Sequence, residues 1–115
     1  MSDLYSKPED FGLSTVGEVE WSEPNYDFDL TVLWRNPQGR LFWADDSGCS
    51  CPMPFEDFAE VGDLKTGTFF DFAKHLNDRL TQLRGSPYLW ARTADIAHAE
   101  PQVVDLLSRA KAVAS

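Results

Sequence analysis

Cysteine and histidine are scarce in this sequence of 115 residues, which contains only two of each. Two cysteines cannot build the disulfide framework of a small secreted domain, and the single residue between Cys49 and Cys51 disfavours an unstrained bond between them. We therefore expect free thiols and a fold held by an apolar core. With 43% hydrophobic and 13% aromatic residues, the chain has enough apolar side chains for one such core.

Long apolar runs and known motifs are also absent. The longest apolar runs span about five residues, far fewer than a bilayer crossing needs, and the first six residues lack the features of a secretory signal. No Walker A loop, no Gly-x-Gly-x-x-Gly segment and no catalytic constellation is recognisable. We predict a cytoplasmic protein without membrane contact, enzymatic activity or cofactor.

Positive charge is short in the first half of the chain. Residues 1–63 contain 14 acidic and 3 basic residues, whereas residues 64–115 contain 5 acidic and 7 basic ones, which gives the net charge of −9. Such a field repels phosphates, so we expect no direct binding of nucleic acid. One alternative function is that of an acidic nucleic-acid mimic, which occupies a basic site on a DNA-handling protein; the other interpretation is acidity kept for solubility. The candidate mimic residues are Glu18, Glu20, Glu23, Asp27, Asp29, Asp45 and Asp46.

Alternating apolar and polar residues predict strands over residues 16–22 and 26–35. Asn36-Pro37-Gln38-Gly39 has the residue preferences of a type I turn, which predicts a hairpin into a third strand that begins at Arg40. If Pro37 and Gln38 alone form the loop, Arg35 pairs with Arg40. Residues 45–54 have turn chemistry throughout and predict an irregular loop.

Both faces of this predicted hairpin are apolar. The assumed register places Val32, Trp34, Leu41 and Trp43 on the face that meets the core, and it leaves Leu33 and Phe42 on a face that needs a second cover. We therefore predict a partner-binding surface there; its apolar anchors are Leu33, Phe42 and Trp90, and its charged rim is Asp27, Asp29 and Arg35. The alternatives are homodimerisation through this face and ordinary core packing under a helix or the N-terminal arm.

Helical spacing of apolar residues predicts a helix that starts after Thr68, with Asp71 as a capping-box partner, and stops at Gly85. A short helix is expected from Thr93 to His98, and a last one from Pro101 to about Val113, because Pro101 pushes Glu100 out of the helical conformation. We assign Lys65, Thr66 and Gly67 to a connector. The fold predicted for this single domain, residues 1–115, is α+β: a three-stranded antiparallel meander followed by two or three helices packed on one face. Residues 1–12 are expected to form a mobile or loosely docked arm.

A zinc-supported module is a third hypothesis. Its only ligands of the right chemistry are Cys49, Cys51, His75 and His98. The cysteine pair lacks the usual gap of two to four residues, and the histidines are far apart in sequence, so we predict no metal. Helical spacing places His75 beside Asp71 and Arg79, which indicates a solvated surface histidine.

The stretch from Tyr26 to Phe58 resembles a family of small uncharacterised proteins encoded by actinobacterial phages. The resemblance rests on Tyr26-Asp27-Phe28-Asp29-Leu30, Trp34-Arg35, Gly39-Arg40-Leu41-Phe42-Trp43, Ser47-Gly48-Cys49-Ser50-Cys51-Pro52 and Pro54-Phe55-Glu56. It covers the middle of the chain and implies a protein made in the cytoplasm of a host bacterium, with no catalytic residue to carry over. By analogy with other small phage domains, it favours a protein that binds a host or phage protein of unknown identity.

Overall fold

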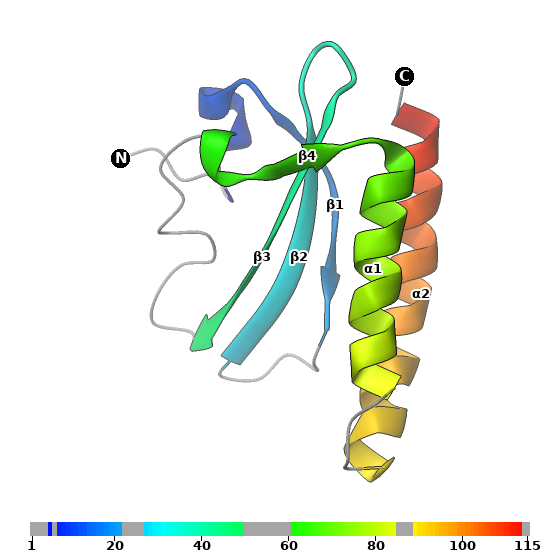
Figure 1. Cartoon of the computed structure of the whole chain (residues 1–115). Coiled ribbons are helices and arrows are strands. Elements are labelled where there is room, and N and C mark those ends of the chain that lie inside the picture. The colour runs from blue at the N-terminus through cyan, green and yellow to red at the C-terminus, as the bar shows by residue number, and fades with distance from the viewer. Residues whose placement is uncertain (1–4, 6, 22–26, 50–60, 85–88, 114–115) are drawn as a thin grey trace.

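Two helices lie side by side on one face of an antiparallel sheet in the computed structural model (Figure 1). The structure describes residues 5, 7–21, 27–49, 61–84 and 89–113. Its elements are the 3-10 helix η1 (Pro8–Phe11), the strands β1 (Ser14–Glu20), β2 (Asp27–Arg35) and β3 (Leu41–Cys49), the 3-10 helix η2 (Val61–Asp63), the strand β4 (Lys65–Gly67), and the helices α1 (Phe69–Arg84) and α2 (Leu89–Val113). The predicted α+β class is confirmed.

The sheet has four strands, in the order β1-β2-β3-β4, rather than the three that the sequence predicted. The fourth is the segment Lys65–Gly67, assigned above to a connector, which pairs antiparallel with Leu41–Trp43. Three residues are too few to show an alternating pattern, so this strand is fixed by pairing and not by its own sequence. β3 also continues to Cys49, through residues that were expected to leave the sheet as a loop.

The β2–β3 hairpin has a register one residue away from the predicted one. Gly39 adopts a left-handed conformation, with φ of 84°, and its amide donates to the Asn36 carbonyl at 3.0 Å. Asn36 and Arg40 then close the loop, and Arg35 pairs with Leu41. The four-residue turn is present as predicted, but Gly39 follows its two central residues as an extra loop residue before β3 begins.

This shift changes which side chains share a face, because neighbouring residues of a strand point to opposite sides. Leu33 now lies opposite Trp43, on the face that the helices cover, which we call the helix face. Leu33 is fully buried there, so the prediction that it lies on an uncovered surface is wrong. Val32 and Trp34 are buried on the opposite side, the far face, and not beside Leu41 and Trp43 as expected.

Each face of the sheet therefore has its own core. On the helix face, the strands pack against Phe72, Leu76 and Leu80 of α1 and against α2; the buried α2 residues are Ala99, Val103, Leu106 and Ala110. On the far face, Val32 and Trp34 pack with residues before β1 and after β3; these are Tyr5, Phe11, Leu13 and Leu64. The second apolar side of the hairpin is thus covered within the chain.

The N-terminal segment packs on the far face wherever the structure describes it. Pro8 of η1 is buried, and the Tyr5 hydroxyl lies 2.9 Å from the Glu18 carboxylate on β1. Burial, together with that hydrogen bond and the charge of Glu18, raises the pKa of Tyr5 to about 12. Part of the segment expected to be a loosely docked arm is therefore tied to the sheet.

α2 runs unbroken from Leu89 to Val113, whereas the sequence predicted a break at Pro101. The side chain of Gln102 supports the helix at this point, because its amide nitrogen donates to the His98 carbonyl at 2.9 Å. The same side chain accepts a hydrogen bond from the amide of Glu20 and donates one to its carbonyl. These are the hydrogen bonds that a neighbouring strand would make at the end of β1. Through the Gln102 side chain, α2 thereby satisfies the hydrogen-bonding groups of the Glu20 backbone in β1 and of the His98 carbonyl in the helix itself.

Close contact between α2 and β1 depends on Gly17. A side-chain carbon at this position would lie 2.8 Å from Cδ1 of the buried Leu106. The register of β1 against β2 also shifts between Thr15 and Gly17, so Val16 is an extra residue at this point of the strand. Among the described residues, neither helix has the length and apolar character to cross a membrane.

Candidate functional site

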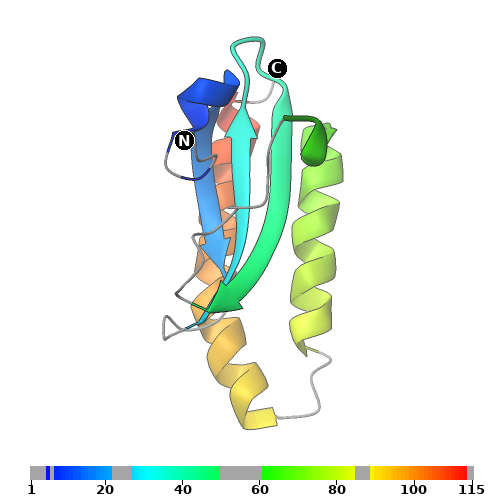
Figure 2. The same ribbon diagram turned by 90° about the vertical axis from the view of Figure 1, so that its left-hand side faces the viewer.

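The hairpin tip, the first turn of α1 and the last turn of α2 lie at the same end of the molecule (Figures 1 and 2). We call this the hairpin end. A capping box fixes the start of α1: the Asp71 amide donates to the Thr68 hydroxyl at 3.2 Å, and the Asp71 carboxylate accepts from the Thr68 amide at 2.9 Å. Phe69 and Phe70 are therefore held in the first helical turn.

The two phenylalanines have different environments. Phe69 is partly buried against the core of the helix face, while Phe70 is 80% exposed, and their rings meet edge to face at 5.7 Å. Successive helical residues point about 100° apart, so only one of two adjacent side chains follows the buried stripe formed by Phe72 and Leu76. An aromatic ring of this size is consequently presented to solvent by a well-capped helix.

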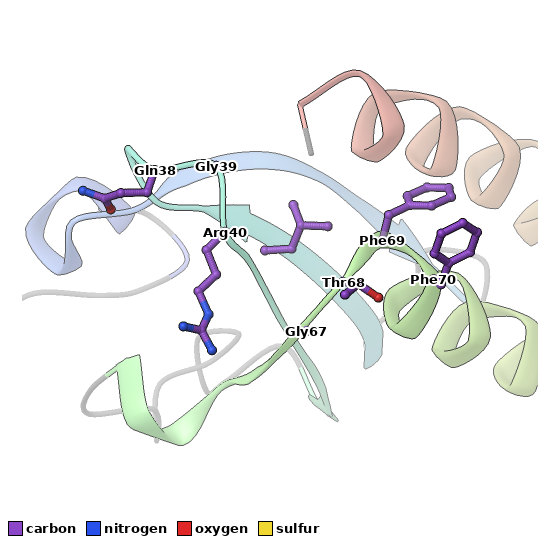
Figure 3. Close-up of a pocket in the computed structure, with 8 residues that line it drawn as sticks. Gln38, Gly39, Arg40, Gly67, Thr68, Phe69 and Phe70 are labelled. Carbon is purple, nitrogen blue, oxygen red and sulfur yellow. The ribbon is translucent and has the colours of Figure 1, made fainter. Parts of the chain in front are cut away.

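A hollow of about 470 Å³ lies between the hairpin arm and the first turn of α1 (Figure 3). We call it the Phe70 hollow; its lining residues are Gln38, Gly39, Arg40, Leu41, Gly67, Thr68, Phe69 and Phe70. Figure 3 shows that the Arg40 side chain points away from the two rings. Its guanidinium is fixed at the outer lip, where Nε donates to the Thr66 hydroxyl at 3.0 Å and the group lies 6.0 Å from the Phe42 ring.

A second hollow, of about 380 Å³, lies on the other side of the hairpin arm, between β1, the end of β2 and the end of α2. We call it the Arg35 hollow; its lining residues are Ser14, Thr15, Val16, Arg35, Arg109, Ala112 and Val113. Arg35 is exposed, and Arg109 pairs with Asp105 one turn earlier on α2 at 3.0 Å. Both hollows open at the hairpin end, since Arg35 lies directly across the ladder from Leu41.

A polar cluster lies at the other end of the helix face, between the sheet and α1. The Trp21 indole donates to the Thr31 hydroxyl at 2.8 Å, and that hydroxyl donates to Asp45. The second carboxylate oxygen of Asp45 lies 2.7 Å from Nε2 of His75. Because an indole N–H can only donate, the hydroxyl proton of Thr31 is committed to Asp45, and Thr31 is not poised as a nucleophile.

Arg79, one turn after His75, forms the second half of this cluster. One of its terminal nitrogens lies 2.9 Å from both carboxylate oxygens of Asp29, and its guanidinium stacks 4.8 Å from the Trp21 ring. Asp29 is thus paired with Arg79, and Asp45 lies against His75, so side chains of α1 engage both carboxylates and attach the helix to the sheet. Two members of the proposed acidic row are accordingly engaged inside the fold.

The predicted partner-binding residues do not form one surface. Leu33 is in the core, as described above, and Phe42 is partly buried on the far face. Arg35 is exposed in the Arg35 hollow, whereas Asp29 is engaged with α1. The side chains of Asp27 and Trp90 lie outside the described part of the structure, so their predicted roles stay predictions.

The predicted metal candidates are only partly described. His75 is half-buried against Asp45, so the expectation of a solvated surface histidine is wrong. His98 lies 3.9 Å from Glu20. Within the described ranges, no three metal-ligating side chains are grouped closely enough to hold an ion. The side chain of Cys49 and the whole of Cys51 lie outside those ranges, and metal analysis of the purified protein remains the test of this hypothesis.

Sequence reasoning missed Phe70, the largest apolar group that the structure exposes among the described residues. The signal was present: Phe69, Phe72, Leu76 and Leu80 follow one helical stripe, and Phe70 falls outside it. The Asp45–His75 contact had no such signal, because 29 positions separate the two residues in the sequence. Only the packing of α1 against β3 brings the two side chains together.

Comparison with known proteins gives a family and no activity. Residues 2–110 match the family model described as a domain of unknown function (DUF7574), and the chain belongs to this family. No curated protein and no solved structure matches it.

Proposed function

Starting from membership of the DUF7574 family, whose description carries no activity, we propose that this protein acts by binding another protein and is not an enzyme. The observation that supports the proposal is the exposure of Phe70 beside the Phe70 hollow. Interfaces are commonly anchored by a few aromatic side chains that become desolvated on binding. A rigidly capped helix that holds a phenylalanine in water has the anatomy of such an anchor.

The size of the effect follows from the buried area. Full burial of an exposed phenylalanine contributes about 2 kcal/mol, which corresponds to roughly a 30-fold change in dissociation constant. Because α1 is fixed by its capping box, little conformational freedom is lost when the ring is covered. The partner surface is therefore the hairpin end, in place of the Leu33 face that the sequence suggested.

We further propose that the protein is phage-encoded and meets its partner in the cytoplasm of a bacterial host. The resemblance of residues 26–58 to small proteins of actinobacterial phages supports this origin. The position of the gene is the test: neighbouring genes for phage structural or replication proteins are expected, and a locus among bacterial housekeeping genes would count against the proposal.

The binding proposal is tested by affinity capture from the natural host with the wild-type chain and Phe70→Ser. Val104→Ser is the matched control, because Val104 is 68% exposed on α2, outside both hollows. We expect a partner that the wild type and Val104→Ser retain and Phe70→Ser loses, with all three variants folded by circular dichroism. Equal capture by all three would refute the role of the hairpin end.

A further inference from the structure

The lining of the hairpin end has a charge opposite to that of the chain as a whole. Among the described residues that line the two hollows there are three arginines, Arg35, Arg40 and Arg109, and no carboxylate. The chain has 19 acidic and 10 basic residues, so a lining in which every charged side chain is basic is not what its composition predicts. Arg109 is paired with Asp105, and Arg40 is held by Thr66, which leaves Arg35 as the arginine whose counter-charge a partner can supply.

From this lining we infer that the partner contributes an acidic segment with one apolar side chain, bound across the hairpin end; the inference rests on the proposed function. The apolar side chain occupies the Phe70 hollow, against Leu41, Phe69 and Phe70. A carboxylate of the same segment lies over the Arg35 hollow, where Arg35 has no carboxylate of its own chain beside it among the described residues. Guanidinium groups match carboxylates in geometry and are the usual choice for this contact.

The sheet sets the spacing of the two contacts. Arg35, Leu41 and Gly67 form one row across β2, β3 and β4. Neighbouring strands lie about 4.8 Å apart, so Arg35 and Gly67 are separated by roughly 10 Å. An extended chain covers that distance in about three residues. The bound segment therefore has its carboxylate and its apolar side chain about three positions apart.

A basic surface with an exposed ring also suits single-stranded nucleic acid, whose bases stack on aromatic side chains. The charge of the whole chain argues against it, because a net charge of −9 repels a phosphate backbone that extends beyond the contact. A short acidic peptide segment reaches Arg35 and the Phe70 hollow without extending over the acidic remainder of the surface. Protein is thus the occupant that the charge distribution favours.

The probe is a nonapeptide with a central Phe, two Gly on each side of it and two Glu at each end, titrated to 5 mM into the 15N-labelled full chain. We expect saturable amide shifts at Arg35, Leu41 and Phe70. Arg35→Glu is expected to weaken binding at least tenfold, and Phe70→Ser to weaken it similarly. Lys7→Glu is the matched control: it changes the net charge equally, lies outside both hollows and is expected to change the affinity less than twofold.

Three results would overturn the inference: no shifts at the hairpin end, equal or tighter binding of the same peptide with Lys in place of Glu, or tighter binding of a nine-nucleotide oligothymidylate at the same residues. The capture experiment separates this failure from failure of the proposed function. If a captured partner is lost with Phe70→Ser but retained fully with Arg35→Glu, protein binding stands and the acidic segment is wrong.

Discussion

Asp45→Asn is the substitution that tests how the helix layer is attached to the sheet. Asp45 accepts a hydrogen bond from the Thr31 hydroxyl and lies 2.7 Å from His75 on α1. Asparagine keeps the shape of the side chain and one acceptor, but it removes the charge that faces His75. With the Asp45 side chain 25% exposed and that of His75 16% exposed, this contact is shielded from most of the solvent.

The expected loss follows from the strength of charge-assisted hydrogen bonds. Such bonds contribute about 1.5–3 kcal/mol, compared with about 1 kcal/mol for neutral ones. The exchange makes the hydrogen bond from the Thr31 hydroxyl a neutral one and removes the charge beside His75, so it should lower the free energy of unfolding by about 1–2 kcal/mol near pH 7. The matched control is Asp78→Asn, which breaks the exposed pair between Lys74 and Asp78 on the outside of α1. We expect a much smaller change there, because surface pairs contribute little.

The same loss should depend on pH. Burial alone raises the pKa of the Asp45 carboxyl, but hydrogen bonds from His75 and Thr31 and the charges of His75 and Arg79 outweigh it and lower the pKa below its ordinary value. The unfolded chain then binds a proton more readily than the folded one. The stabilisation is therefore complete above the unfolded pKa of about 3.9 and is lost as the pH falls through the folded value.

Urea unfolding from pH 7 to pH 2.5, followed by tryptophan fluorescence, measures this directly. Wild type and Asp45→Asn should differ by the full amount down to about pH 5 and converge as the pH falls below about 4. A difference of the same size at every pH would show that the asparagine acts through packing and not through charge. No difference at pH 7 would refute the role of the Asp45–His75 contact altogether.

Two further predictions concern the contact between α2 and β1. Gly17→Ala should lower the free energy of unfolding by about 1–3 kcal/mol, because the new carbon would lie 2.8 Å from the buried Leu106. Gly62→Ala is the control: a new carbon there has nothing within 4 Å, so the free energy of unfolding should fall far less in the same urea titration. Gln102→Ala should lower the free energy of unfolding by about 2 kcal/mol. It should also accelerate hydrogen exchange of the Glu20 amide, because that amide donates a hydrogen bond of 2.9 Å to the Gln102 side chain. Unchanged exchange at Glu20 would contradict that contact.

The parts of the fold that the sequence predicted well are those with a long repeating pattern. The alternation over residues 26–35 corresponds to β2, and the helical stripe with its Thr68 cap corresponds to α1. The parts that it missed lack such a pattern. β4 is three residues long, and the continuation of α2 through Pro101 depends on a side chain, Gln102, whose partners are on α2 itself and on β1.

The candidate site was predicted less well than the fold, for a related reason. The sequence indicated that the hairpin has apolar residues on both sides, and this is correct, but it does not say what covers each side. Residues before β1 and after β3 cover the far face, while the helices cover Leu33. A helical-wheel argument can find the exposure of Phe70, whereas the contact between Asp45 and His75 follows only from the tertiary structure.

The error in the register shows how much depends on one turn residue. Pairing Arg35 with Arg40 assumed that Gly39 belongs to the strand, yet a type I turn leaves the chain with a twist that a left-handed residue must correct before the strand can begin. Glycine at this position, with φ of 84°, makes that correction without steric cost. One additional loop residue then exchanges the two faces of β3 relative to β2, which places Leu33 opposite Trp43 on the helix face and aligns Arg35 with Leu41. The same residue therefore determines which β3 side chain shares the helix face with Leu33, and which one lies opposite Arg35 at the hairpin end, where the proposed partner binds.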